Sequence, residues 1–192
     1  MQKLSARVVS LHAITKMDPT NAAKESLSFE LDGIVGDRHR GIERACYAGD
    51  KQPKDSRRRN ERMWSAMSVE EVAEITEEMD LAQPLTPEVL TTNLYLEGCP
   101  ELTRLPKGSI LKFPSGAELI VEEANAPCLD KGTQIAESFT TNSGKPIENT
   151  TFSKVAKLKR GLLGVVEVAG DVHVGDEIEI TVYEHPSWLA RS

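Results

Sequence analysis

The chain has 192 residues, of which 39% are hydrophobic and 28% are charged, and its formal net charge is -7. This length is typical of one globular domain, which can bury a sufficient core without a disulfide or a metal. The acidic balance argues against a nucleic-acid partner, because neutralising phosphates requires a basic face. Three widely spaced cysteines do not form a disulfide framework. Neither a signal peptide nor a membrane-spanning apolar stretch is visible, so we expect a cytoplasmic protein that does not bind membranes.

The first third of the chain combines a strand pattern with turn and loop patterns. Residues 3–14 are rich in β-branched residues and partly alternate, which predicts a first strand. The segment 32–41, DGIVGDRHRG, carries glycines and aspartates that are typical of turns. Residues 48–62 lack apolar periodicity and predict an exposed loop. That loop holds the only dense positive run of the chain, which consists of Arg57, Arg58, Arg59 and Arg62.

One helix is clearly predicted, over the sequence SVEEVAEITEEMD that begins at Ser68. Ser68 and Glu71 form a capping-box signature, and the apolar residues that follow recur at helical spacing. The prolines of QPLTPE, residues 83–88, end this helix.

The second half of the chain consists mostly of strand patterns. Residues 93–98 form a short alternating run, and residues 105–113 and 117–124 predict a hairpin joined through Pro-Ser-Gly. Residues 140–151 form a polar loop, and residues 161–182 predict two further strands. The fold class that follows is mainly β with one or two helices, arranged like a β-barrel.

Cys128 lies in the sequence EEANAPCLDKG, directly after a proline, where an apolar strand pattern stops. A cysteine just beyond a strand end can reach solvent or a cleft, where its thiolate is a nucleophile or a soft metal ligand. Lys131 favours the thiolate and Asp130 opposes it. The alternative is an inert core cysteine, which is a common fate of free cysteines. Cys46 and Cys99 are expected to be structural.

The sequence GDRHRG offers a possible anion site. Gly36 and Gly41 allow backbone N–H groups to converge, while Arg38 and His39 supply further donors. The alternative is an ordinary turn with solvated side chains. Spacings that indicate a zinc site, a serine hydrolase or a phosphate-binding P-loop do not occur.

In this order, the segments GIVGDRHRG, TTNLYLEG, LPKGSILKFPSGAELIVEEANAPC and RGLLGVVEVAGDVHVGDEIEI resemble the MOSC domain, which is named after molybdenum cofactor sulfurases. The resemblance covers about residues 33–180 and is closest to the short, stand-alone bacterial members. We therefore interpret residues 1–192 as a single MOSC domain with a basic loop insertion at about 42–62. No part of the chain corresponds to the pyridoxal-phosphate domain of eukaryotic sulfurases.

The resemblance implies a β-barrel-like fold that binds the molybdenum cofactor, molybdopterin. It places the family cysteine, a molybdenum ligand or a sulfur carrier, at Cys128. The residues that it assigns to cofactor binding are Asp37, Arg38, His39, Asn93, Lys159 and Arg160.

Two functions follow from these roles. In the first, the protein is a molybdenum-dependent oxidoreductase that reduces N-hydroxylated small molecules, with Cys128 as the metal ligand and a separate electron donor as partner. In the second, Cys128 carries sulfur as a persulfide that it receives from a cysteine desulfurase, without turnover. A domain that has lost the cofactor, with Cys128 merely packed, is a third possibility.

Overall fold

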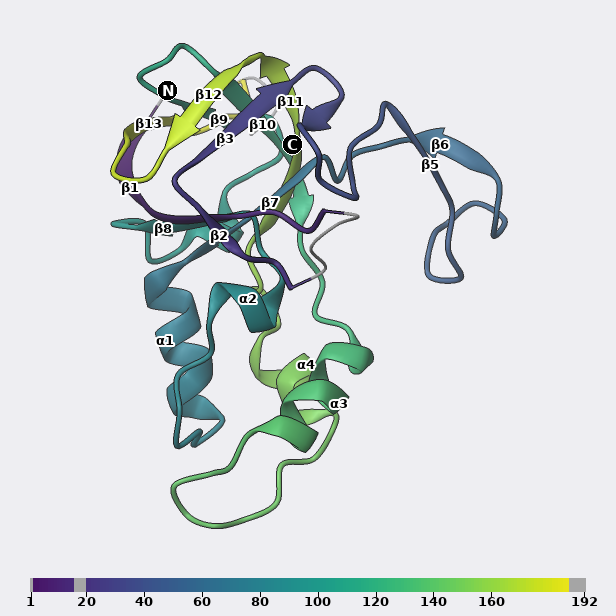
Figure 1. The fold of residues 1–192 in the computed structure, drawn as a ribbon, viewed down its shortest axis with the longest axis vertical. Helices are drawn as coiled ribbons and strands as arrows, with labels where there is room; N and C mark the ends of the chain where they lie inside the picture. The colour runs from purple at the N-terminus through teal and green to yellow at the C-terminus, as the bar shows by residue number, and fades with distance from the viewer. Residues whose placement is uncertain (1, 16–19, 187–192) are drawn as a thin grey trace.

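The computed structural model describes residues 2–15 and 20–186 and shows a closed β-barrel with helices below it (Figure 1). The barrel strands follow the order β13-β9-β10-β11-β7-β8-β1, and β1 pairs again with β13. β7 and β8 are parallel, while the other neighbours in the barrel are antiparallel. The barrel strands are β1 (Lys3–His12), β7 (Trp64–Ser68), β8 (Leu94–Glu97), β9 (Ile110–Lys112), β10 (Glu118–Ala124), β11 (Leu162–Val168) and β13 (Glu177–Thr181).

Short strands complete the β structure. β2 (Ala23–Lys24) pairs with the end of β1, and a second sheet contains β3 (Ser26–Glu30), β4 (Gly33–Ile34) and β12 (Gly170–His173). This sheet buries its apolar side chains in the same core as the barrel. The predicted mainly-β, barrel-like class is confirmed. Residues 161–182 hold three strands and not two, because the turn at Ala169 sends β12 into the second sheet.

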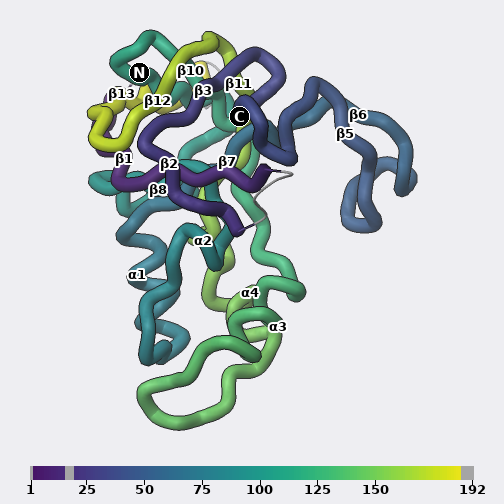
Figure 2. The backbone as a smooth tube through the Cα atoms, in the orientation of Figure 1, coloured from purple at the N-terminus to yellow at the C-terminus, as the bar shows by residue number. Residues whose placement is uncertain are grey.

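The helices form a layer on one side of the barrel (Figures 1 and 2). They are α1 (Val69–Glu78), α2 (Pro87–Leu90), the 3-10 helix η1 (Leu102–Arg104), α3 (Leu129–Ser138) and α4 (Thr151–Val155). The apolar faces of α1, α2, α3 and α4 share a second core around Ile75, Ile135 and Phe152, whereas Leu102 of η1 packs into the barrel core. Only α1 was predicted, because the others are too short or too polar for a periodic apolar pattern. Within residues 2–15 and 20–186, no helix is both long and apolar enough to cross a membrane.

Only one of the two hydrogen bonds of the predicted capping box forms at the start of α1. Ser68 Oγ accepts a hydrogen bond of 3.1 Å from the backbone N–H of Glu71. The Glu71 carboxylate accepts two bonds from Thr103 instead of reaching back to Ser68. Burial raises the pKa of this carboxyl, although the bonds from Thr103 oppose the shift. The signature therefore predicted the helix start correctly, while tertiary structure assigned the glutamate another partner.

Residues 42–62, here called the arm, project from the barrel as a hairpin (Figures 1 and 2). Its strands are β5 (Glu43–Ala45) and β6 (Arg57–Arg59). The predicted loop over 48–62 therefore holds except for Arg57–Arg59, which form a short strand. Ion pairs replace an apolar core inside the arm. Arg44 binds both carboxylate oxygens of Asp50, at 2.6 and 2.8 Å, and Arg58 binds Asp50 at 2.9 Å. A strand held by ion pairs carries no apolar alternation, which explains why the pattern was missed.

Gly164 in β11 allows a close approach of the neighbouring barrel strands β7 and β10. A Cβ atom at this position would lie 2.1 Å from Ile120 O and 2.2 Å from Trp64 Cζ2. We expect Gly164→Ala to lower the free energy of unfolding by about 3 kcal/mol or more, measured by urea denaturation. Gly49→Ala is the control, because its nearest contact would be 3.5 Å from Tyr47 Cε2. Equal stability of the two variants would contradict this account of the barrel packing.

Candidate functional site

The pairing of β10 with β11 brings Cys128 and Arg160 together although 32 positions separate them. Ala124, the last residue of β10, pairs with Leu162, the first of β11. One step further, the backbone N–H of Asn125 donates to Gly161 O at 2.8 Å. The segment between these strands contains α3 and α4. It begins near Cys128 and ends near Arg160.

Cys128 is exposed and occupies the N-cap position of α3. The strand does end before it, at Ala124, as the proline predicted. The N-terminal end of a helix carries partial positive charge and free N–H groups, which stabilise a thiolate. Lys131 lies one helical turn later, on the same face as Cys128. The thiol is therefore accessible and lies in an electropositive environment, while Cys46 and Cys99 are buried.

Arg160 is buried, with 6% of its surface exposed, and has no carboxylate partner in the described part of the chain. Its guanidinium donates to Met67 Sδ at 2.9 Å and to the backbone oxygen of Leu90. Burial lowers the pKa of Arg160 to about 10, and repulsion from Arg62 adds to this, while attraction to Cys128 opposes it. Burying an ion without a counter-ion costs several kcal/mol. An anion bound beside Arg160 would offset this cost.

Lys131 belongs to the same electrostatic group. Its ammonium donates to Val89 O at 2.5 Å and to Gln134 Oε1 at 2.7 Å. Burial lowers the pKa of Lys131, as do the charges of Arg160 and Arg38, whereas Cys128 raises it. Cys128 interacts electrostatically with Lys131 and Arg160, while Arg38 acts on Lys131 and Arg62 acts on Arg160.

The partners of the arginines distinguish this group from the rest of the protein. Arg38, Arg62 and Arg160 form no ion pair with a described carboxylate, although the chain carries an excess of acidic residues. Every other described arginine has a carboxylate partner within 4 Å; these are Arg7, Arg40, Arg44, Arg57, Arg58, Arg59 and Arg104. Positive charge that is left unpaired in an acidic protein indicates an anion site.

The early motif forms a chain of hydrogen bonds that ends at Arg38. Asp37 Oδ1 accepts from the backbone N–H of His39 at 2.8 Å and lies 3.0 Å from its Nδ1. Arg38 Nε donates to His39 Nε2 at 3.2 Å, which assigns the ring proton to Nδ1. Burial raises the pKa of Asp37, but the bonds with His39 outweigh this and lower it below its ordinary value. The buried carboxylate thus orients His39, and His39 orients Arg38.

Asn93 stabilises this series of hydrogen bonds through Asp37, and its side chain does not face the thiol. Its side-chain amide donates to His12 O at 3.1 Å and to Asp37 Oδ2 at 3.3 Å. Its oxygen accepts from the backbone N–H and the hydroxyl of Ser65, both at 3.0 Å. Asn93 therefore fixes the carboxylate of Asp37 against β7 and β8.

Lys159, like Asn93, is a predicted site residue whose side chain does not face the thiol. Its ammonium binds Glu74 at 3.1 Å and also pairs with Glu78, both on α1. Lys131, which the sequence named only as a neighbour that favours the thiolate, belongs to the site. Arg62, which acts on Arg160, was not predicted as a site residue, because nothing in the sequence separates it from the arginine run. Within the described ranges, no cluster of three His, Cys, Asp or Glu residues could hold a metal ion.

Similar proteins carry the same fold over nearly the whole chain. "Putative metal-sulfur cluster biosynthesis proteins YuaD" of Bacillus subtilis (strain 168) is 34% identical over 186 residues, which cover 95% of this chain and 94% of that one. The crystal structure of the YUAD protein from Bacillus subtilis matches with a TM-score of 0.87 and 32% identity, over 95% of this chain and 99% of that one. YiiM from Geobacillus stearothermophilus shares the fold, with a TM-score of 0.59 and 14% identity over 92% of this chain and 75% of that one.

A family model described as the MOSC domain matches residues 53–179, which is more than half of the chain. Asn93, Cys128, Lys159 and Arg160 lie inside the matched range. The match begins after the early motif, so Asp37 to His39 lie before it, and the arm is matched only in its second half. The chain belongs to the MOSC domain family.

Proposed function

We propose that this protein binds the molybdenum cofactor, with Cys128 as a ligand of the metal, and reduces N-hydroxylated small molecules. The observation that carries the proposal is the buried, carboxylate-free guanidinium of Arg160 beside the exposed thiol of Cys128. A phosphorylated, metal-bearing cofactor presents both an anion and a soft metal, which match these two groups.

The donor set of the site fits such a group. Arg160 and Lys131 are held by backbone oxygens at the end of α2, which fixes their charges without neutralising them. Arg38 is oriented through His39. An arginine fork and an ammonium together suit phosphate and oxo groups, because each offers several N–H donors.

The cofactor supplies two-electron, oxygen-removing chemistry when it is bound. Reduction of a hydroxylamine to an amine consumes two electrons and two protons and releases one water. A separate protein must supply the electrons. The residues of this chain bind the anionic groups and present the thiolate, and His39 orients Arg38 by accepting its hydrogen bond.

A second function, sulfur transfer, is favoured by the exposure of Cys128 and by the name of the Bacillus relative, which refers to metal-sulfur cluster biosynthesis. In this reaction the Cys128 thiolate attacks the terminal sulfur of a donor persulfide, and the donor cysteine leaves as a thiolate. No electron is consumed. The cations that would bind the cofactor would here stabilise the persulfide anion.

Cys128→Ser tests the ligand role. We expect this variant, made in a host that synthesises the cofactor, to lose reduction of an N-hydroxylated amine with reduced methyl viologen as donor. Its free energy of unfolding should stay within about 1 kcal/mol, because the side chain is exposed. Cys99→Ser is the matched control: it changes a buried cysteine and should keep its activity per folded molecule. Full activity of Cys128→Ser would contradict the assignment.

Arg160→Met separates binding from stability. The variant should lose at least about tenfold in molybdopterin content, because one charge-assisted interaction with the anion disappears. The cofactor-free variant should be at least as stable to urea as the unsubstituted protein, because the cost of the buried unpaired charge is removed and no carboxylate loses its partner. Lys159→Met is the control, because Lys159 binds the glutamates of α1 and should not affect cofactor content. Similar cofactor loss in both variants would refute a specific role of Arg160.

Sulfur transfer predicts a covalent product. After incubation with a cysteine desulfurase and cysteine, the peptide that contains Cys128 should gain the mass of one sulfur atom, while the Cys46 and Cys99 peptides remain unchanged. The measurement is mass spectrometry of the digested protein without reductant. An unmodified Cys128 under these conditions would remove the carrier function.

A further inference from the structure

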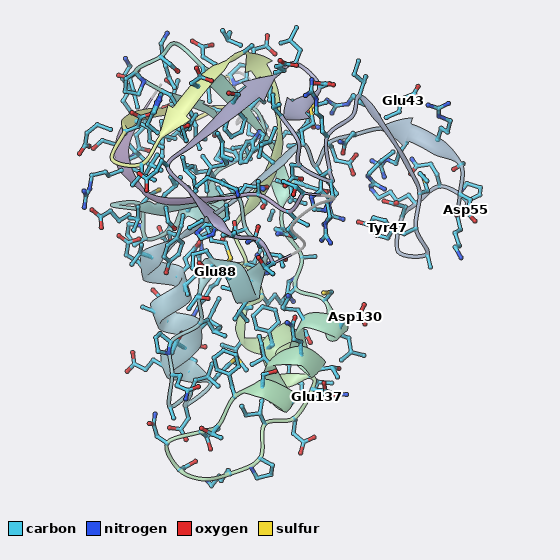
Figure 3. All side chains as sticks on the ribbon, in the orientation of Figure 1. Glu43, Tyr47, Asp55, Glu88, Asp130 and Glu137 are labelled. Carbon is cyan, nitrogen blue, oxygen red and sulfur yellow. The ribbon has the colours of Figure 1, made fainter. Side chains whose placement is uncertain are left out.

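The short helix α2 ends at Thr91, which has a left-handed backbone with φ 53° and ψ 47°. The helix lies between the barrel and the helices α3 and α4, where Glu88 marks it (Figures 1 and 3). The N–H of Thr91 donates to Glu88 O, and the N–H of Thr92 donates to Pro87 O, both at 3.2 Å. These two bonds form a Schellman motif, in which glycine usually occupies the left-handed position.

Threonine is an unfavourable residue at this position. A left-handed backbone places the Cβ atom of any residue other than glycine close to a carbonyl oxygen, and β-branched residues tolerate it least. Strained residues of this kind are kept where the surrounding structure determines them, and they cluster at ligand-binding sites. Thr91 makes a bond that glycine cannot make, because its Oγ1 donates to Leu90 O at 2.7 Å.

Leu90 O is also the carbonyl that holds the buried guanidinium of the candidate site. The Schellman motif leaves the last two carbonyls of α2 without a backbone donor. Val89 O accepts from Lys131 at 2.5 Å, and Leu90 O accepts from Arg160. The hydroxyl of Thr91 and the guanidinium of Arg160 therefore share one carbonyl, which has two lone pairs to accept them. A neutral carbonyl orients Arg160 and leaves its charge available to an anion.

A separate contact holds the turn itself. The side-chain amide of Asn21, which is buried, donates to Pro87 O at 3.0 Å and to Thr92 O at 3.2 Å. The two backbone bonds of the Schellman motif do not involve the Thr91 side chain either. The turn therefore keeps its fold when the hydroxyl is removed, and the role of the hydroxyl can be tested separately from folding.

We propose that Thr91 is a positioning residue of the anion site: its hydroxyl fixes Leu90 O, and Leu90 O fixes Arg160 in the orientation that binds the anion. This inference rests on the proposed cofactor function, in which Arg160 binds an anionic group of the cofactor. Donors that are ordered before the ligand arrives bind it more tightly, because less conformational freedom is lost on binding. The strained threonine thus contributes to binding and not to the stability of the turn.

Three substitutions in the full chain separate these effects. Thr91→Gly removes the hydroxyl and the backbone strain, Thr91→Val removes the hydroxyl and keeps the branched shape, and Thr91→Ser keeps the hydroxyl. Three quantities are measured for each variant: molybdopterin per polypeptide after purification from a host that synthesises it, calorimetric binding of inorganic phosphate to the cofactor-free protein, and the urea midpoint of the cofactor-free protein.

Thr91→Gly and Thr91→Val should each lose about fivefold in molybdopterin content and bind phosphate about fivefold more weakly, since one hydrogen bond that orders Arg160 is missing. Thr91→Ser should stay within about twofold of the unsubstituted protein. The urea midpoint of Thr91→Gly should equal or exceed that of the unsubstituted protein, because the strain is relieved. Weaker binding by a protein that is at least as stable is not expected of a purely structural residue.

Asp55→Gly is the matched control. Asp55 also has a left-handed backbone, with φ 68°, but it lies on the outer side of the arm (Figure 3). Its replacement by glycine relieves the same kind of strain and should change neither molybdopterin content nor phosphate binding.

Unchanged molybdopterin content and phosphate binding in Thr91→Gly would overturn the role of Thr91 and leave the cofactor function intact. Equal losses in Thr91→Ser and Thr91→Gly would overturn it too, because the hydroxyl would then be irrelevant. If the unsubstituted protein holds no molybdopterin, the cofactor function fails and phosphate decides: the role of Thr91 stands if Arg160→Met and Thr91→Gly both weaken phosphate binding. If the unsubstituted protein binds neither ligand, both proposals fail.

Discussion

The pairing of β10 with β11 is the constraint on which the candidate site depends. These strands are neighbours in a closed barrel, so the register that joins Ala124 to Leu162 cannot slip without exposing the core of both strands. The register fixes where the segment that contains α3 and α4 leaves β10 and where it joins β11. Cys128 and Arg160 lie at these two points, and their proximity is a consequence of barrel closure rather than of any local motif.

The ion pairs are distributed unevenly among the arginines. Most described arginines, including Arg44, Arg57, Arg58 and Arg59 of the arm, are neutralised by nearby carboxylates, whereas Arg38, Arg62 and Arg160 are not. An unpaired guanidinium that is buried as deeply as Arg160 lowers the stability of the empty protein. Such a cost is typical of binding sites, which violate the rules that the rest of a structure obeys.

Much of the fold could be predicted from local patterns. Alternating apolar residues gave most of the barrel strands, Pro-Ser-Gly gave the hairpin of β9 and β10, and Ser68 gave the start of α1. β7 was not predicted, because it is buried on both faces and does not alternate. The hairpin of the arm was missed because ion pairs, not apolar residues, hold it, and α3 and α4 were missed because they are stabilised by contacts between segments that are distant in the sequence. Gly132 of α3 illustrates this: a Cβ atom there would lie 2.1 Å from Asn149 O, a close approach that no local pattern encodes.

The sequence by itself determined that Cys128 follows the end of a strand, because the preceding proline lacks an N–H and restricts the backbone before it. It also determined that the Arg38–His39 turn could donate hydrogen bonds. Only the tertiary structure decided which cations face the thiol. Lys159 and Arg160 are adjacent in the chain, yet one binds the glutamates of α1 and the other lies buried beside Cys128. The physical reason is that neighbouring side chains point in different directions, and the packing around each one, not its charge, selects its partner.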